Sequence, residues 1–435
     1  MPASKGPVLY ISYDGLAEPL GQSQVVGYLE RLASAHRITV LSYEKLADLR
    51  DRARMRKLED RLQAAGIRWV RLRYHKRPSL PATAWDIAAG LLAGWRLCAA
   101  RRVRLVHARG YVPSVIALVL QRLCGVKFLF DMRGFWPEEK VEAGHWSRRS
   151  PAYRLAKQWE RRFFERADAI VSLTRAGVCV FPELGYRIPA ATPVAVIPTC
   201  VDTGRFRPGP TDEALRRRLG LEGRLVIGCT GTLSGWYRRS GTLQFIARLA
   251  RELPDAAALF VTREDHVGLR HDALAAGIPA GRLAITAAAF DAMPAHLRLM
   301  RLGVFFIAPS FSKRGSAATK LAEFLASGVP VVINDGVGDS GALVREQGAG
   351  VVLPELSERA TADALIEVRA LLADSACAAR CRLAALRHFD LKEGVDAYLR
   401  VYHRLLTPEG AVMDAVTTGL DAMGEAAEVP AEVQR

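Results

Sequence analysis

Short apolar segments rich in Val, Ile and Leu alternate along the chain with longer segments in which apolar residues recur at a helical period. In the first half of the chain, the apolar segments predict strands at residues 8–12, 38–43, 69–72, 105–109, 127–132, 169–174 and 194–198. Helices are expected at residues 23–35, 47–65, 112–124 and 152–166. Strands that alternate with helices are typical of a parallel sheet covered on both faces.

The alternation restarts after residues 203–210, which are rich in Pro and Gly and are expected to be an interdomain linker. Six further strands are predicted at residues 224–231, 257–262, 282–288, 302–310, 330–335 and 350–354. The pattern therefore predicts an α/β protein with two Rossmann-like, doubly wound parallel-sheet domains, residues 1–203 and 204–388. Such sheets bind ligands at the carboxyl ends of their strands, so we expect the two domains to face a central cleft.

The chain ends in two different kinds of segment. Residues 389–406 are expected to form a return helix, because one apolar stripe contains Val395, Tyr398, Leu399, Tyr402 and Leu405. Residues 407–435 hold six acidic residues and one basic residue without such a stripe. This acidic segment is predicted to be disordered.

Composition narrows the class of protein. The chain has 435 residues, of which 50% are hydrophobic and 24% charged, an ordinary globular balance that suits two domains. Its seven cysteines form no CxxC pair, so neither a disulfide framework nor a structural zinc site is indicated. The first residues lack the pattern of a signal peptide, and we expect a cytoplasmic protein.

The net charge of +16 is concentrated, because residues 44–109 contain 17 Lys or Arg against 6 Asp or Glu. Such a surface attracts nucleic acid, anionic lipid or anionic substrates, unless it is only a solvated face. No nucleic-acid-binding signature is present, so no nucleic-acid partner is expected. An apolar helical segment, residues 85–100, is interrupted by charges and is not expected to span a membrane. Together these features predict peripheral contact with the inner face of an anionic membrane.

Two loops of the first domain carry candidate chemistry. Gly21 and Gln22 are expected in a polar turn just before a helix, where backbone N–H groups could bind a phosphate, although an ordinary turn is the alternative. Asp131 and Arg133 follow an apolar strand and stand beside an indole, Trp136. They are predicted to be catalytic, with a structural salt bridge as the alternative.

The second domain opens with a glycine-rich turn that contains Gly231, followed by Arg238 and Arg239. Such a turn with basic residues beside it suits a diphosphate, because Arg can hold phosphate oxygens in a bidentate fork. We expect Arg238 to be the functional arginine and Arg239 to be solvated.

A later helix, expected at residues 317–327 with Ser316 as its cap, places Lys320 and Glu323 on one face. Lys320 is predicted to meet a phosphate, and Glu323 to accept hydrogen bonds from two vicinal hydroxyls, unless the two form a surface ion pair. Gly338 and Asp339 follow the next strand and are expected to contact the donor.

The segments KLAEFLASGVPVV, AVIPTCVDTGRF and ADAIVSLT resemble motifs of the GT-B glycosyltransferases of family 4 (glycosyltransferase group 1) over nearly the whole chain. The resemblance implies retaining transfer of a sugar from a nucleotide-sugar donor to a glycan or lipid-linked acceptor, as in polysaccharide biosynthesis. It implies no cofactor and no required metal, and no D-x-D motif is present. Arg238 and Lys320 would neutralise the diphosphate, and Glu323 would bind the ribose. Gly21 and Gln22 would face the diphosphate and the acceptor.

The sequence departs from the family pattern where a first Glu of the E-x7-E motif would stand, because residue 315 is Gly. A non-catalytic GT-B binding protein is therefore an alternative. A nucleotide-sugar epimerase is another. An oxidoreductase is disfavoured, because the G-x-G-x-x-G pattern at residues 336–341 follows the fifth strand of its domain instead of the first.

Overall fold

The computed structural model describes residues 6–407, apart from the side chain of Ser79, so the predicted disorder of the acidic segment falls on residues outside the described part. The described chain divides into two compact units. The first runs to Ile197 and resumes at Gly394, and the second is Pro198–Glu393. The division therefore falls six residues before the expected boundary at residue 203, and residues 203–210 belong to the second unit.

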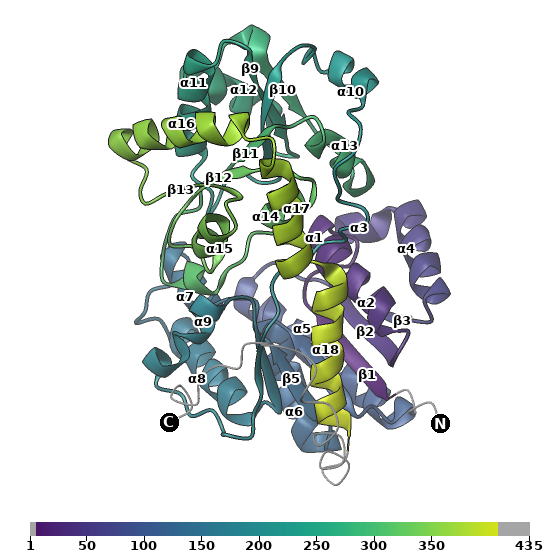
Figure 1. Cartoon of the computed structure of the whole chain (residues 1–435). Helices are drawn as coiled ribbons and strands as arrows, with labels where there is room; N and C mark the ends of the chain where they lie inside the picture. The colour runs from purple at the N-terminus through teal and green to yellow at the C-terminus, as the bar shows by residue number, and fades with distance from the viewer. Residues whose placement is uncertain (1–5, 408–435) are drawn as a thin grey trace, which may run out of the picture. The chain divides into compact units, whose positions relative to one another are not determined.

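The first unit contains one sheet of seven parallel strands in the order β3-β2-β1-β4-β5-β6-β7 (Figure 1). Each predicted strand is present. The strands are β1 (Pro7–Ser12), β2 (Arg37–Glu44), β3 (Arg68–Arg73), β4 (Leu105–Arg109), β5 (Lys127–Asp131), β6 (Ala169–Ser172) and β7 (Val194–Val196). The strand order reverses between β1 and β4, which is where sheets of this kind open a crevice for ligands.

Helices connect these strands. They are α1 (Pro19–Gly21), η1 (Gln22–Val26), α2 (Gly27–Leu32), α3 (Leu46–Arg50), α4 (Arg52–Ala64), α5 (Ser79–Arg101), α6 (Tyr111–Cys124), α7 (Trp136–Glu142), α8 (Pro151–Arg166), α9 (Arg175–Val178), η2 (Phe181–Leu184) and α18 (Leu391–Leu406). The expected single helix at residues 47–65 is split at Asp51, whose side chain caps α4 by accepting from the backbone N–H of Arg54. Among residues 6–407, no helix is long and apolar enough to cross a membrane.

The second unit contains six parallel strands in the order β10-β9-β8-β11-β12-β13. They are β8 (Leu225–Thr230), β9 (Ala256–Val261), β10 (Leu283–Thr286), β11 (Leu302–Val304), β12 (Val331–Asn334) and β13 (Gly350–Leu353). The order reverses between β8 and β11, so the loops that follow these two strands stand at a second ligand-binding position. Both predicted Rossmann-like sheets are confirmed.

The helices of the second unit are α10 (Glu213–Arg218), α11 (Arg239–Glu252), α12 (His266–Ala275), η3 (Ala280–Arg282), η4 (Phe290–Ala292), α13 (Met293–Leu297), η5 (Ser312–Gly315), α14 (Thr319–Ala326), α15 (Ser340–Glu346), α16 (Glu358–Ala373) and α17 (Cys377–His388). Close packing sets the position of α14. A Cβ atom added to Gly303 of β11 would lie only 2.8 Å from the ring of Phe324, so glycine is needed for the helix to approach the strand.

Candidate functional site

The loop after β8, residues 231–238, is the frame of the candidate site in the second unit. Gly231 and Gly235 have φ values of +73° and +68°, which side chains of L-residues rarely allow. Glu264, just after β9, holds the loop, because its Oε1 accepts from the backbone N–H groups of Leu233 (3.2 Å) and Ser234 (3.0 Å) and from the Ser234 hydroxyl (2.5 Å). The loop is therefore preorganised by the fold.

Lys320 lies beside this loop. It is the second residue of α14 and only 7% exposed. Its Nζ donates to the carbonyl oxygen of Thr232 (3.0 Å), lies 3.6 Å from the ring centroid of Tyr237, and would be 3.9 Å from a Cβ atom on Gly231. Burial lowers the pKa of Lys320, against the opposing effect of Cys229 and Glu323. The structure thus brings Gly231 and Lys320 together, as their expected roles require.

Glu323 follows one turn later on α14 and is half-buried. Within the described chain its carboxylate accepts no hydrogen bond. Burial raises its pKa to about 7, although the charges of Lys320 and Arg205 oppose the shift. A carboxylate that is partly desolvated and unpaired is available to accept from hydroxyl groups of a ligand.

The two arginines after the loop are placed differently from the expectation. Arg239 is half-buried, and its Nη2 lies 2.7 Å from Oδ2 of Asp272 in an ion pair. Arg238 is the exposed member of the pair, and its backbone N–H donates to the carbonyl of Phe306 (2.8 Å). The expectation that Arg239 is the solvated arginine is therefore wrong. Arg238 has no acidic partner in the described chain, and its expected role stays a prediction.

The loop after β12 carries Gly338 and Asp339. The backbone N–H of Gly338 donates to the carbonyl of Lys313 (2.9 Å), and Asp339 stands at the start of α15. This contact joins the loop to η5, the short helix that leads to α14. Ser316 does not cap α14, because the helix begins after Ala318 without a side-chain cap.

Lys313 was missed by the sequence reasoning. It is 4% exposed, and its Nζ lies 3.9 Å from the ring centroid of Trp236. Trp236 and Tyr237 are neighbours in the loop after β8, so adjacent aromatic rings each carry a buried lysine. The sequence offered one signal for this lysine, which is that the basic pair Lys313-Arg314 follows closely after the apolar segment at residues 302–310.

In the first unit, the polar turn expected at Gly21 and Gln22 is wrong. The chain is already helical from Pro19, and residues 22–26 form a π-helical turn inside that helix. A Cβ atom on Gly21 would lie 2.1 Å from the carbonyl oxygen of Gly15, so this glycine serves close packing. The Gln22 side chain donates to the carbonyl of Leu16 (2.6 Å) and accepts from Arg61 (3.1 Å). The helix starts at Pro19, so Gly21 lies in its first turn, and the expected contact of these residues with a phosphate stays a prediction.

Asp131 and Arg133 are also placed differently from an open catalytic pair. Asp131, the last residue of β5, is 1% exposed, and its Oδ2 accepts from the Tyr398 hydroxyl of α18 (3.1 Å) and lies 3.2 Å from Nε2 of His107. Arg133 Nη1 lies 3.4 Å from Oδ1. Burial would raise the pKa of Asp131, but Arg133 and the His107 hydrogen bond hold it below its usual value. Asp131 therefore forms a buried ion pair with Arg133, and its hydrogen bonds to His107 and Tyr398 connect β5 with β4 and α18.

His107 completes this interior network and was not predicted. Its Nδ1 lies 2.7 Å from the hydroxyl of Tyr402. Burial lowers the pKa of His107, although the hydrogen bond to Asp131 opposes the shift. Tyr398 and Tyr402 of the predicted apolar stripe thus also make polar contacts, since their hydroxyl groups hydrogen-bond to Asp131 of β5 and His107 of β4.

Comparison with known proteins shows similarity to glycosyltransferases. A model of the "Glycosyl transferase 4-like domain" matches residues 21–200. The lipopolysaccharide core biosynthesis mannosyltransferase LpcC of Rhizobium leguminosarum bv. viciae is 27% identical over 338 residues, which are 75% of this chain and 85% of that protein. Residues 21–200 thus resemble a glycosyl transferase 4-like domain, and the chain is similar to a known glycosyltransferase over most of its length.

Solved structures agree with the fold of this glycosyltransferase. A glycosyltransferase from Rickettsia africae matches with a TM-score of 0.71 at 13% identity and covers 93% of this chain and 100% of that one. Anabaena HepE, crystallised with UDP and glucose, matches with a TM-score of 0.66 at 18% identity over 91% of this chain and 98% of that one. These likenesses establish the GT-B fold.

The chain departs from the family 4 pattern at η5. Gly315, at the position of the first Glu of the E-x7-E pattern, is the last residue of η5 and is buried. Lys313 is the charged residue of this turn that lies against the loop after β8. Among residues 6–407, no group of three or more His, Cys, Asp or Glu side chains is arranged to hold a metal ion.

Proposed function

We propose that this glycosyltransferase moves a sugar from a nucleotide-sugar donor to a glycan or lipid-linked acceptor, with retention of anomeric configuration and without a resident metal. The observation that supports the proposal is the cluster of Gly231, Lys320 and Glu323 beside the switch point of the second unit. Gly231 contributes a loop that suits a phosphate, and Lys320 and Glu323 contribute a buried cation and an unpaired carboxylate within one turn of α14.

Donor binding follows from the chemistry of the three groups. The diphosphate would lie against the loop at Gly231, where Lys320 supplies charge. Burial lowers the pKa of Lys320, and the negative charge of a diphosphate would stabilise its protonated form. Glu323 would accept from the two ribose hydroxyls, which are spaced to suit one carboxylate.

The same cations account for catalysis. When the bond between the anomeric carbon and the diphosphate breaks, negative charge grows on the leaving diphosphate. Lys320 is held by Thr232 and Tyr237 before the reaction starts, so its charge needs no reorganisation. The exposed Arg238 would approach the same oxygens. Side-chain cations in these positions can supply the stabilisation for which other transferases use a bound divalent ion.

The relatives suggest where to start with substrates. LpcC is named as a lipopolysaccharide core mannosyltransferase, and HepE was crystallised with UDP and glucose. We therefore propose a hexose donor and an acceptor in polysaccharide or lipid-linked glycan synthesis.

An exposed face of α5 supports a membrane-bound acceptor. Trp85, Leu92 and Trp95 are 66%, 49% and 50% exposed and fall on one side of the helix. Exposed arginines at residues 96, 101 and 102 follow. Aromatic residues beside basic ones favour the interface of an anionic bilayer, and we propose that the enzyme works at the inner face of a membrane.

The test is transfer with a panel of UDP-, GDP- and ADP-sugars, beginning with mannose and glucose donors, on lipid-linked and soluble glycan acceptors. We expect a glycosylated product whose new linkage has the anomeric configuration of the donor, at the same rate in EDTA. Lys320→Ala should slow transfer by about two or three decades, whereas Lys392→Ala, which removes an exposed lysine of α18, should leave the rate unchanged. Donor epimerisation without transfer would instead show an epimerase, and binding without turnover a non-catalytic protein.

A further inference from the structure

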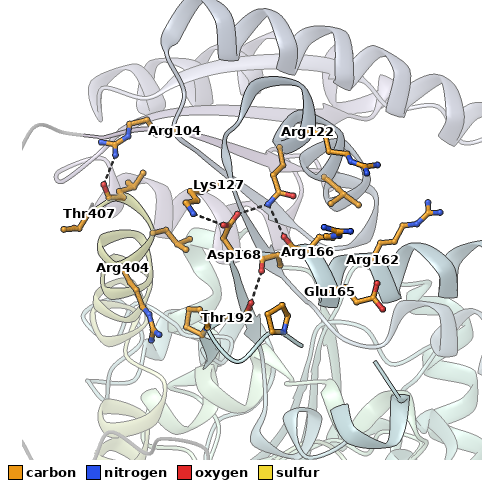
Figure 2. A pocket seen from close by; sticks show the side chains of 18 residues that line it. Arg104, Arg122, Lys127, Arg162, Glu165, Arg166, Asp168, Thr192, Arg404 and Thr407 are labelled. Carbon is orange, nitrogen blue, oxygen red and sulfur yellow. Dashed lines mark hydrogen bonds and ion pairs between the residues drawn. The ribbon is translucent and has the colours of Figure 1, made fainter. Parts of the chain in front are cut away.

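A large basic hollow lies at the amino-terminal edge of the first unit's sheet, the edge opposite the carboxyl ends of its strands. It has a volume of about 1440 Å³ (Figure 2). Residues just before or at the start of β4, β5 and β6 line it, as do the ends of α6, α8 and α18. Its six cations are Arg104, Arg122, Lys127, Arg162, Arg166 and Arg404. Only two acidic residues, Glu165 and Asp168, line it with them.

Asp168 is fully engaged and balances Lys127, but it pairs with none of the arginines of the hollow. Its carboxylate accepts from Lys127 Nζ (3.0 Å), from Gln121 Nε2 (2.8 Å) and from the backbone N–H of Phe128 (2.8 Å). Figure 2 shows it at the centre of the hollow, with Arg162 and Arg404 on opposite sides. The hollow therefore keeps a positive excess that its own acids do not balance.

Several of the arginines have no acidic partner within the described chain. Arg122, Arg166 and Arg404 make no ion pair there. Arg162 lies over the ring of Trp159 at 5.1 Å. Arg122, Arg166 and Arg404 stand in the last turns of α6, α8 and α18, where roughly half a negative charge of each helix dipole favours them. Against the two acidic residues, the six cations of the lining leave an excess of four positive charges, which three helix ends are too weak to balance, so the hollow suits an anion.

The chain itself supplies an anion next to the hollow. Thr407 lines it, and the residues that follow, 408–435, contain one basic and six acidic residues, which are Glu409, Asp414, Asp421, Glu425, Glu428 and Glu432. At about 3.3 Å per extended residue, even a third of this segment reaches across the hollow. The segment starts at the site that its charge complements.

We propose that the acidic segment, residues 408–435, binds in the basic hollow of the same molecule and shields it from other polyanions. A tethered segment has an effective concentration in the millimolar range, which favours it over a free ligand with similar charge. Occupancy would leave the exposed face of α5 as the surface that meets a membrane, and it would be weakened by salt, because the contacts are exposed ion pairs.

Zero-length carbodiimide coupling of the full-length protein, read by mass spectrometry, tests the proposal, because it joins a lysine only to a carboxylate in contact with it. Lys127 is the one lysine that lines the hollow, and its side chain is 51% exposed. Lys127 also contacts Asp168, so a link between these two residues is expected in every variant and serves as an internal standard. Beside it we expect links from Lys127 to acids of residues 408–435 within the monomer, several-fold more abundant than links from exposed Lys57, and lost as salt rises.

Charge variants separate binding from mere closeness along the chain. The triple variant Arg122→Gln, Arg162→Gln, Arg404→Gln keeps Lys127 and should reduce these links roughly tenfold, the effect of losing about three exposed ion pairs. The matched variant Arg52→Gln, Arg56→Gln, Arg68→Gln removes the same charge from exposed positions of α4 and β3 and should leave them unchanged. Thermal unfolding would show that both variants fold.

Two outcomes would overturn the proposal. Equal coupling in the wild type and the hollow variant would show that the links reflect the tether alone. If the hollow variant loses binding to phosphatidylglycerol vesicles while the links persist, the hollow receives lipid headgroups and not the acidic segment.

Discussion

The carboxyl group of Glu323 gives the sharpest test of the candidate donor site. Its pKa lies near 7 instead of the usual 4.5, because burial disfavours the charged form more than Lys320 and Arg205 favour it. Replacing Glu323 by Gln keeps the size of the side chain and removes the titration. Comparing the variant with the wild type therefore measures how much the ionised, partly buried carboxylate lowers the free energy of unfolding.

The magnitude and sign follow from linkage. A shift from 4.5 to about 7 corresponds to about 3 kcal/mol, an upper limit because Glu323 is only half-buried. Since the pKa is raised in the folded protein, the stabilisation is complete below pH 4.5 and is lost as pH rises through 7. Above pH 7 the wild type carries a cost that Glu323→Gln lacks. For a unit of about 200 residues this is worth at most about 10 °C in Tm.

Differential scanning calorimetry at pH 5, 7 and 8.5 measures the effect. We expect the Tm of Glu323→Gln to approach that of the wild type at pH 5 and to exceed it by several degrees at pH 8.5. Glu346→Gln, an exposed substitution at the end of α15, should show no such trend. A Tm difference that stays constant over this range would refute the account of Glu323 as a desolvated carboxyl.

Donor binding should follow the same titration in the opposite direction. If the ionised carboxylate accepts from the ribose, the affinity of the wild type for its nucleotide-sugar should rise about tenfold from pH 6 to pH 8, as the ionised fraction rises about tenfold. Glu323→Gln should bind more weakly at pH 8 and show little pH dependence, measured by isothermal titration calorimetry. Wild-type affinity that is flat with pH would remove Glu323 from the nucleotide site.

Three further predictions concern other residues of the second unit. Lys320→Ala should lower kcat by about two or three decades with a smaller change in donor affinity, because its charge acts on the departing diphosphate; steady-state kinetics would show the split. Arg238→Ala should reduce turnover, and Arg239→Ala should leave turnover unchanged. Because Arg239→Ala breaks only a partly exposed ion pair, it should change the unfolding free energy by less than about 1 kcal/mol. If turnover falls in Arg239→Ala and not in Arg238→Ala, Arg239 is the functional residue. Gly303→Ala should destabilise the protein by about 1 to 3 kcal/mol in urea unfolding, since its Cβ would press on Phe324, and an unchanged midpoint would contradict that packing.

The periodic pattern was sufficient for the architecture. Strands buried on both faces are near-continuous apolar runs, so β4, β5 and β12 are visible as segments of sequence. The extent of β11 was less visible. Its apolar run continues to residue 310, but the strand ends at Val304, and Ile307 instead donates its backbone N–H to the side chain of Asn334.

Local composition was a poor guide to the loop after β1. The sequence around Gly21 and Gln22 is rich in turn formers, yet the chain there is helical. The reason is tertiary, because the helix passes so close to the carbonyl of Gly15 that only a glycine fits at position 21. A contact between residues six positions apart leaves no periodic signal.

Asp131 shows that sequence alone does not distinguish a ligand-binding carboxylate from a buried one. A carboxylate at the end of a central strand has the same sequence signature whether it faces a ligand or the interior. Its partners Tyr398 and His107 are distant in sequence, and only the fold shows that they occupy it. Lys313 is the converse case, because the sequence suggested no role for it and the fold places it against Trp236.

The helix α18 has a consequence for how the protein is made. Its residues from Gly394 onward belong to the first unit, although the whole of the second unit is synthesised before them. Until they leave the ribosome, Asp131 and His107 lack the hydroxyl groups of Tyr398 and Tyr402. The unit that is translated first is therefore the last to be completed, and the second unit, continuous in sequence, can fold while the nascent chain is still growing.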